Sequence, residues 1–177
     1  RVKYHALVLA TGANPFVPPI PGSGLPGVMT LRTLAQAKDI LAKVGDGTRC
    51  VCIGGGLLGI ELGAGLAKRG GEVTILEGSS GVLSRQLAPR GSAVLRQGIE
   101  SLGISIRCNS KVLEILEGGG DRGLRVLLDG GVEFGADTVM ISAGVRPNTA
   151  LAQACGLEVG RGLKVDDSMR TSDNSIF

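Results

Sequence analysis

The stretch that most constrains this chain is VCIGGGLLGIELGAGLAKRGGEVTILEG, residues 51–78. It begins with an apolar run typical of a buried strand, turns through consecutive glycines, and continues as an apolar helix pattern that Gly70 ends. A second strand pattern, EVTILE, follows over residues 72–77. A strand, a glycine turn, a helix and a second strand in this order predict a βαβ unit with parallel strands.

The glycines of this unit have a recognisable spacing. Gly54, Gly56 and Gly59 match G-x-G-x-x-G between the predicted strand and helix. The first permits the tight turn, the second lets the backbone touch a pyrophosphate, and the third brings the helix close to the strand, while the helix N-terminus attracts the phosphates. We therefore expect cofactor contacts over the turn and the helix start: Gly54, Gly55, Gly56, Leu57, Leu58 and Gly59. The competing interpretation is a ligand-free turn in a chain that contains 30 glycines.

Two acidic residues add chemical detail. Glu77 ends the second strand 18 residues after Gly59, where a carboxylate accepts hydrogen bonds from the adenosine ribose hydroxyls. A 2′-phosphate would meet like charge there, so the residues predict NAD(H) rather than NADP(H); the alternative is a solvated glutamate at a strand end. Glu61 either faces the nicotinamide end of the cofactor and binds its carboxamide, or only interacts favourably with the helix dipole.

Helix signals occur on both sides of this unit. Thr33 and Gln36 form a capping-box pattern at the start of a helix that Gly45 ends. A third helix begins near Pro89 and ends at Gly103. The apolar residues of the first helix share one predicted face: Leu34, Ala37, Leu41 and Val44.

Strand patterns occupy most of the remaining chain. ALVLATG (6–12) and ADTVMISAG (136–144) are typical of buried strands, and residues 161–177 offer two short ones. Residues 14–27 hold five of the seven prolines and predict a stiff extended linker. Between residues 104 and 135, four short strand patterns separated by GGGDRG and DGG predict hairpins: ISIRC, KVLEILE, LRVLLD and VEFG. The predicted fold is α/β: a Rossmann-like dinucleotide-binding domain with a parallel sheet, helices and a β-meander.

Composition argues against several other classes of protein. With three phenylalanines, one tyrosine and no tryptophan, and a formal net charge of +3 without a dense basic run, we expect no nucleic-acid binding. No apolar run is long enough to span a bilayer. The four cysteines form no C-x-x-C pair and the only histidine is His5, so we expect no metal site and reduced structural thiols in a cytoplasmic protein.

Three motifs in order carry a family resemblance that covers essentially the whole chain. LVLATGANPFVPPIPG, IGGGLLGIELGAGLAKRGGEVTILE and ISAGVRPN together resemble the FAD-dependent pyridine nucleotide–disulfide oxidoreductase superfamily. In that superfamily the NADH domain is inserted within the FAD domain. The resemblance therefore implies a partial FAD-domain strand and linker at 1–30, the NADH-binding domain at 31–147, and the return into the FAD domain at 148–177.

The resemblance also implies roles for single residues. Ala10-Thr11-Gly12 and Ser142-Ala143-Gly144 are similar to the two crossings between the domains, so Thr11, Gly12 and Gly144 are expected near cofactor. Gly144 would lie beside the nicotinamide ribose, and Glu61 would contact the carboxamide. FAD itself would need the family's first glycine fingerprint and its closing Gly-Asp motif, which these residues do not contain, so we expect a fragment that is inactive alone.

Within the superfamily, residues 85–104 and 151–177 are most similar to the large subunit of assimilatory NAD(P)H-dependent nitrite reductases. This likeness implies an enzyme module that binds NADH and passes hydride to FAD, with no catalytic acid or base of its own. Electrons would continue to sirohaem and iron–sulfur domains that feed nitrite reduction to ammonia. The alternatives are the NADH module of a rubredoxin or ferredoxin reductase or of an NADH oxidase-like flavoprotein, and a non-enzymatic sensor domain.

Overall fold

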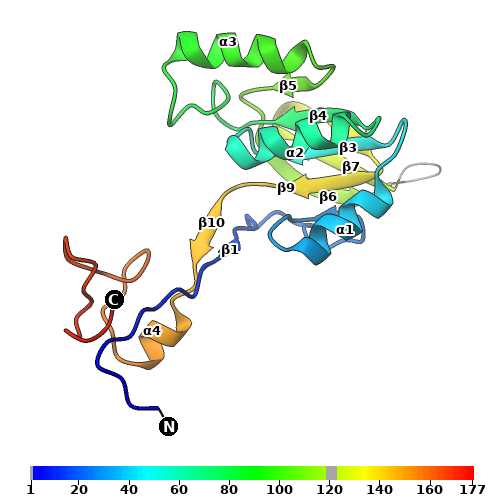
Figure 1. The fold of residues 1–177 in the computed structure, drawn as a ribbon. Helices are drawn as coiled ribbons and strands as arrows, with labels where there is room; N and C mark the ends of the chain where they lie inside the picture. The colour runs from blue at the N-terminus through cyan, green and yellow to red at the C-terminus, as the bar shows by residue number, and fades with distance from the viewer. Residues whose placement is uncertain (1, 119–122) are drawn as a thin grey trace. The chain divides into compact units, whose positions relative to one another are not determined.

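The computed structural model describes residues 2–118 and 123–177, and these form two compact units (Figure 1). The larger unit is Pro15–Gly144, and the smaller one joins the residues up to Asn14 to Val145–Phe177. This division by compactness differs from the predicted boundaries after residues 30 and 147. The predicted boundaries separate an NADH-binding domain from parts of an FAD domain. Compactness alone does not test that assignment, so it stays a prediction.

The larger unit is built on a five-stranded parallel sheet, which confirms the predicted fold class. Its strands, in spatial order, are β2 (Val28–Met29), β9 (Thr138–Ile141), β3 (Arg49–Ile53), β4 (Glu72–Leu76) and β5 (Ser105–Arg107). The helices are α1 (Leu34–Lys43), α2 (Leu57–Ala67) and α3 (Pro89–Glu100). The segment from β3 through α2 to β4 is the predicted βαβ unit.

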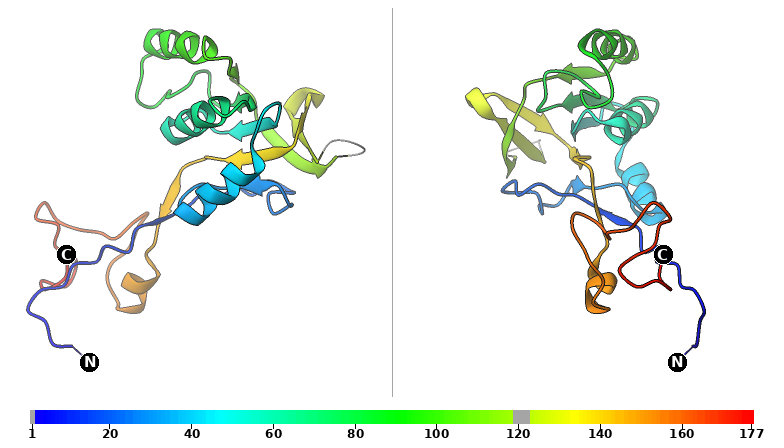
Figure 2. Two further views of the ribbon diagram at one scale, coloured as in Figure 1. Left: turned by 45° about the vertical axis from the view of Figure 1, so that its right-hand side comes forward. Right: turned by 90° about the vertical axis from the view of Figure 1, so that its left-hand side faces the viewer.

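Apolar side chains cover both faces of this sheet. Along β3, Cys50 and Cys52 point into a core that the helices share, as their alternation predicts. Val51 and Ile53 point to the opposite face, into a core shared with an antiparallel meander. The right-hand view of Figure 2 shows the three helices on one side of the sheet and the meander on the other.

The meander consists of β6 (Val112–Glu117), β7 (Leu124–Leu128) and β8 (Glu133–Ala136), paired antiparallel as predicted. The prediction was wrong for ISIRC, which forms β5 and pairs parallel with β4 instead of joining the hairpins. The DGG turn forms a short 3₁₀ segment, η1 (Asp129–Gly131), in which Gly130 and Gly131 have φ of 76° and 75°. Most of the other predicted turn, GGGDRG, lies outside the described residues. The positive φ angles explain why these two positions of the DGG turn are glycine.

Helix α1 has its predicted cap, but the apolar face predicted for it is only partly buried. The Thr33 side chain accepts from the Gln36 N–H, and Gln36 accepts in return from the Thr33 N–H. The buried side chain is Ile40, at 2% exposure, whereas Leu34 is 73% exposed and Leu41 45%. Val44, at 3% exposure, is buried, so the four residues of the predicted face are not buried together. The orientation of the helix depends on the sheet it packs against.

The proline-rich segment, predicted as a stiff extended linker, packs against the larger unit. The Ile115 N–H donates to the Pro21 carbonyl at 2.9 Å, and a side chain on Gly22 would overlap the Ile115 carbonyl. Ile20 and Leu25 pack against the meander-side core. The prolines therefore stiffen a segment that belongs to the larger unit.

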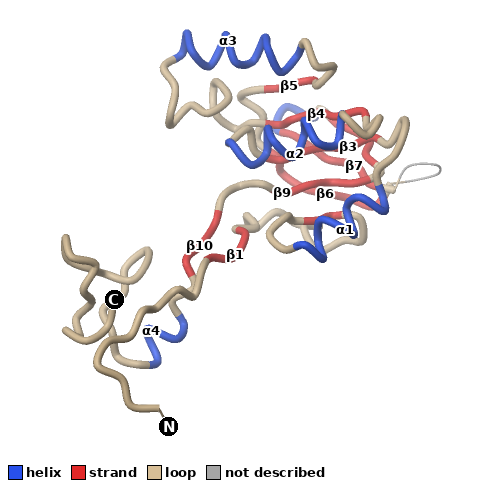
Figure 3. Tube along the Cα trace, viewed as in Figure 1, coloured by secondary structure: helices blue, strands red, loops and turns tan. Residues whose placement is uncertain are grey.

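The smaller unit has little regular structure (Figure 3). Its elements are β1 (Ala13–Pro15), which pairs with β10 (Val145–Pro147), and α4 (Ala150–Ala154). The predicted strand over residues 6–12 is wrong, since Leu7 forms only an isolated bridge with Ile176 and Val8 is 72% exposed. The tail likewise shows isolated bridges, Val159 with Leu163 and Ile176 with Leu7, instead of two strands. Backbone hydrogen bonds join Leu7 and Leu9 to residues 175–177, but this pairing is too short to make a strand of residues 6–12.

Candidate functional site

The candidate site lies at the carboxyl ends of three adjacent parallel strands, β3, β4 and β9. The glycine turn follows β3, Glu77 follows β4, and Ser142 follows β9. The Gly54 N–H donates to the Leu76 carbonyl at 2.8 Å, and the Ser142 N–H donates to the Ile53 carbonyl at 2.9 Å. This edge of an open α/β sheet is where such folds bind ligands.

Two of the fingerprint glycines are required by the protein itself. Gly54 has φ of 114°, and a Cβ there would overlap the Ser142 carbonyl. A Cβ on Gly59 would overlap the Gly54 carbonyl oxygen, because α2 crosses directly beside the turn. These are the tight turn and the close helix–strand approach that the spacing predicted.

Gly56 is different, because nothing in the protein requires a glycine there. Its φ is −78°, and a Cβ built on it meets no atom within 4 Å. Gly56 is the N-cap of α2, where no side-chain cap hydrogen bond is present. The turn therefore leaves open space beside a helix N-terminus, which fits the approach of a pyrophosphate to the backbone.

Glu77 is half-buried and held by backbone donors on both oxygens. The Gly55 N–H donates to its Oε2 at 2.6 Å, and the Ser79 N–H donates to its Oε1 at 2.7 Å. A carboxylate has about four lone-pair positions, so acceptor capacity remains for hydroxyl groups. This geometry fixes the direction of the carboxylate instead of leaving it loose in solvent.

The start of α2 presents apolar surface and one acid. Leu57 is 60% exposed and Leu58 55%. Glu61 is exposed as well, and no hydrogen bond or ion pair joins its side chain to any other residue that the structure describes. These side chains are available to a ligand on the glycine turn, but their predicted contacts are not tested by the geometry.

Gly144 shares the larger unit with the turn, whereas Thr11 and Gly12 belong to the smaller one. Gly144 has φ of 106°, and its carbonyl accepts from the Phe16 N–H at 2.8 Å. In the smaller unit, the Thr11 hydroxyl donates to the Asn148 carbonyl at 2.7 Å, and the Gly12 carbonyl accepts from the Asn148 N–H at 2.9 Å. Thr11 and Gly12 thus hold the outgoing and returning segments together.

The sequence did not identify the segment after Glu77 as part of the site. The Leu83 N–H donates to the Gly55 carbonyl at 3.1 Å, and Ser79 holds the Glu77 carboxylate. The available signal was the glycine and serine content of residues 78–84, which indicates a loop that returns toward the turn.

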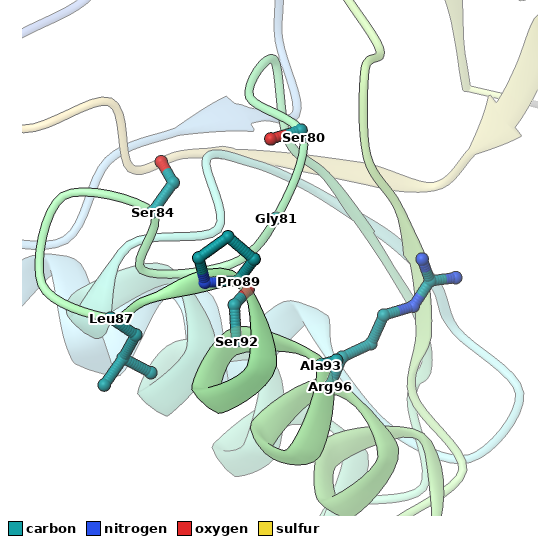
Figure 4. A pocket seen from close by; sticks show the side chains of 8 residues that line it. All are labelled: Ser80, Gly81, Ser84, Leu87, Pro89, Ser92, Ala93 and Arg96. Carbon is teal, nitrogen blue, oxygen red and sulfur yellow. The ribbon is translucent and has the colours of Figure 1, made fainter.

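Beside this loop lies a pocket of about 220 Å³ between residues 80–87 and α3 (Figure 4). A side chain on Gly81 would overlap the Ser92 hydroxyl, which donates to the Val82 carbonyl at 2.7 Å. Figure 4 shows the Arg96 side chain pointing away from Ser84, and its guanidinium binds Glu100 and the Ile106 carbonyl. The pocket therefore has no converging set of polar groups.

The four cysteines form no disulfide, and the two on β3 are buried. All four are free, and no group of three or more His, Cys, Asp or Glu in the described ranges is arranged to hold a metal ion. Burial raises the pKa of Cys52 to about 12 and that of Cys50 to about 11. These thiols stay protonated at neutral pH and act as small apolar side chains.

Among the helices that the structure describes, none has the length and apolar character that a membrane crossing requires.

The comparisons with known proteins agree on one family. The pyridine nucleotide-disulphide oxidoreductase family matches residues 1–177. The large subunit of nitrite reductase [NAD(P)H] of Klebsiella oxytoca is 39% identical over 179 residues, covering 100% of this chain and 18% of that protein. The nitric oxide reductase FlRd-NAD(+) reductase of Klebsiella pneumoniae is 37% identical over 175 residues, covering 99% of this chain and 45% of that protein.

A solved structure shares the fold as well. The ferredoxin reductase of Rhodopseudomonas palustris superposes with a TM-score of 0.91 at 34% sequence identity, over 99% of this chain and 43% of that one. The present chain thus spans less than half the length of each of these three relatives.

Proposed function

Because the chain belongs to the pyridine nucleotide-disulphide oxidoreductase family, whose members use FAD and NAD(P)H, we propose that it is the NADH-binding part of such an enzyme. The observation that carries this proposal is the space left at Gly56. Gly54 and Gly59 have structural reasons to be glycine, and Gly56 has none within the protein. A ligand whose phosphates touch the backbone explains its missing side chain.

In this proposal the glycine turn and α2 bind the pyrophosphate. The first N–H groups of α2 have no partner inside the helix, and the N-terminal end of its dipole favours negative charge. No acidic residue lies in its first turn to oppose the phosphates. The turn thus binds the group that all nicotinamide dinucleotides share and does not choose between NADH and NADPH.

The choice of nucleotide belongs to Glu77. Its oxygens keep acceptor capacity for the two adenosine ribose hydroxyls while the Gly55 and Ser79 N–H groups hold the carboxylate in place. A 2′-phosphate would remove one donor and bring two negative groups together. We therefore propose NADH as the preferred nucleotide.

At the other end of the site, Glu61 and Gly144 are proposed to position the nicotinamide. Glu61 would accept from the carboxamide, and the open backbone of Gly144 would lie beside the nicotinamide ribose. Bound NADH supplies the hydride, which FAD accepts. The residues of this chain orient the nucleotide, and no side chain is needed to move a proton.

The domain assignment follows the same proposal. Residues 31–147 would be the NADH-binding domain, and residues 1–30 and 148–177 its connections to an FAD domain near Thr11 and Gly12. The 177-residue chain alone is then expected to bind NADH and to transfer no electrons.

For the electron acceptor, we propose nitrite reduction to ammonia, in a cytoplasmic enzyme with sirohaem and iron–sulfur domains. The similarity to the Klebsiella oxytoca nitrite reductase favours it. The equally specific alternative is reduction of a small electron-transfer protein such as rubredoxin or ferredoxin, which the similarity to the Klebsiella pneumoniae FlRd-NAD(+) reductase and to the Rhodopseudomonas palustris ferredoxin reductase favours. Assays of the enzyme that contains this chain, with nitrite and with rubredoxin or ferredoxin, would separate the two.

The experiment that tests nucleotide binding is a set of dissociation constants for NADH and NADPH, measured by calorimetry. The wild-type chain should prefer NADH by roughly tenfold or more. Glu77→Arg should reverse or abolish this preference, because a guanidinium can bind the 2′-phosphate. Glu72→Arg places the same charge at the exposed start of the same strand and should leave the preference intact.

Two results would contradict the proposal. Absence of NADH binding by the wild-type chain at millimolar concentration would remove the dinucleotide site. Binding of both nucleotides with equal affinity, unchanged in Glu77→Arg, would leave the site but refute the role of Glu77.

A further inference from the structure

Gly55 is a glycine that the fingerprint does not explain, because it occupies the variable position between Gly54 and Gly56. Its conformation is not left-handed. A Cβ at Gly55 would lie 3.0 Å from Oε2 and 3.1 Å from Cβ of Glu77, and 3.2 Å from Cγ1 of Val82. The Glu77 side chain therefore packs directly against the backbone of the phosphate-binding turn.

Two hydrogen bonds join Gly55 to the segment 77–83, one through its N–H and one through its carbonyl. The Gly55 N–H donates to Glu77 Oε2 at 2.6 Å, and the Gly55 carbonyl accepts from the Leu83 N–H at 3.1 Å. The turn is thus joined to residues 77–83 by both polar groups of a single glycine. The bond to Glu77 has an ionised acceptor, which makes it the stronger of the two.

Glu77 is itself firmly anchored. Its N–H donates to the Arg107 carbonyl at 2.8 Å, and its carbonyl accepts from the Ser110 N–H at 2.9 Å. Its second carboxylate oxygen accepts from Ser79. The carboxylate is therefore held in place at the sheet edge, and the glycine turn is hydrogen-bonded to it.

From these contacts we propose that Glu77 is also a positioning residue, which holds the glycine turn in its phosphate-binding shape before any nucleotide arrives. This inference rests on the proposed NADH site and adds a coupling within it. Three consecutive glycines lose much backbone entropy when they are ordered, and a pre-formed bond reduces that loss on binding. Recognition of the adenosine ribose and recognition of the phosphates then depend on one carboxylate.

The test uses a probe that cannot reach Glu77. Reduced nicotinamide mononucleotide carries one phosphate and the nicotinamide ribose but no adenosine, so a ribose-reading residue alone would not affect it. In the full 177-residue chain, Glu77→Ala should weaken its binding by roughly threefold or more, the loss expected of one hydrogen bond. Glu77→Gln, whose amide oxygen can accept one of the two N–H bonds, should give a smaller loss. Glu72→Ala is the matched control on the same strand and should change nothing.

A second measurement reports the contact without any ligand. In ¹⁵N NMR spectra, hydrogen exchange at the Gly55 amide should accelerate roughly tenfold or more in Glu77→Ala, in line with the loss of its acceptor. Circular dichroism checks that the variants are folded. If Glu77→Ala is unfolded, Glu77→Leu, which also lacks an acceptor, takes its place, and unchanged exchange at the Gly55 amide of the folded variant overturns the inference.

The outcomes also separate this inference from the proposed function. Suppose that Glu77→Ala weakens NADH binding but leaves the mononucleotide affinity and the hydrogen exchange of the Gly55 amide unchanged. Glu77 then contacts the adenosine ribose only, so the positioning role is refuted and the NADH site stands. If the wild-type chain binds neither NADH nor the mononucleotide, the proposed function fails and this inference fails with it.

Discussion

At the residue scale, the glycines of the turn have three different physical reasons. Gly54 and Gly59 avoid overlap with the protein's own carbonyl groups. Gly55 gives room to the Glu77 side chain, and Gly56 leaves open space. The G-x-G-x-x-G pattern does not distinguish these reasons, although substitutions at the different glycines should affect stability and binding differently.

Gly56→Ala should separate binding from stability. Its Cβ would project into open space at a permitted φ, so the free energy of unfolding should change by at most about 1 kcal/mol, the scale of an N-cap substitution. NADH affinity should nevertheless fall roughly tenfold or more, because the methyl group occupies the path of the phosphates. Gly59→Ala is the contrasting variant, expected to cost stability first because its Cβ overlaps the Gly54 carbonyl. Urea unfolding and NADH titration of both variants check this, and equal stability losses would contradict it.

The buried thiols predict a dependence of stability on pH. Burial raises the pKa of Cys52 to about 12 from an ordinary 9.0, so the folded form keeps a proton that the unfolded chain loses above pH 9. Stability should therefore fall as the pH rises, by about 1.4 kcal/mol for this thiol between pH 8 and pH 10. Urea unfolding of Cys52→Ala at both pH values should show a loss smaller by that amount than the wild-type loss. Equal losses in wild type and Cys52→Ala would refute the prediction.

At the element scale, α1 shows the limit of a helical pattern. The cap at Thr33 depends on residues three apart in the chain and formed as predicted. The buried face depends on how the helix lies against the sheet, and the structure buries Ile40 and Val44 there. Leu34 and Leu41 stay exposed although they belong to the same apolar stripe.

The stability cost of substitutions on α1 should follow the burial of each side chain in the structure, not its place in the apolar stripe of the sequence. Ile40→Ala should cost about 2–5 kcal/mol of unfolding free energy, because it empties a position that is 2% exposed. Leu34→Gln, at a residue 73% exposed, should change stability by less than about 0.5 kcal/mol. Urea denaturation of the two variants decides, and a larger loss for Leu34→Gln would restore the face predicted from the sequence.

At the scale of the whole molecule, the cores of the two units share no residue. The helix-side and meander-side cores lie entirely within Pro15–Gly144. The smaller unit has a core of its own, in which Ala152, Leu157 and Ile176 are buried. The glycine turn, Glu77 and Gly144 all belong to the larger unit, so the proposed NADH site does not require the smaller one.

Residues 15–144 should therefore fold when expressed alone. We expect a cooperative urea transition and an NADH dissociation constant within about threefold of that of the full chain, since both cores and the site are retained. Fluorescence is a poor probe with so few aromatic residues, so circular dichroism and calorimetry are the appropriate measurements. A non-cooperative transition, or loss of NADH binding in a folded segment, would contradict the independence of the larger unit.

What the sequence by itself determined is local. The alternation of β3, the G-x-G-x-x-G turn, the cap of α1, the proline at the start of α3 and the meander depend on residues close together in the chain, and all are present in the structure. They were enough to predict an α/β dinucleotide-binding fold and the glycine turn of the candidate site.

What only the tertiary structure decided depends on partners distant in the chain. Residues 6–12 have a strand pattern, but a strand also needs a ladder of backbone pairing, and the bridge between Leu7 and Ile176 is isolated. The contact of Glu77 with Gly55 joins residues 22 apart, and its cause is the lateral pairing of β3 with β4. Spacing in a sequence predicts which residues reach one sheet edge, whereas their hydrogen bonds form only after parallel strands have paired.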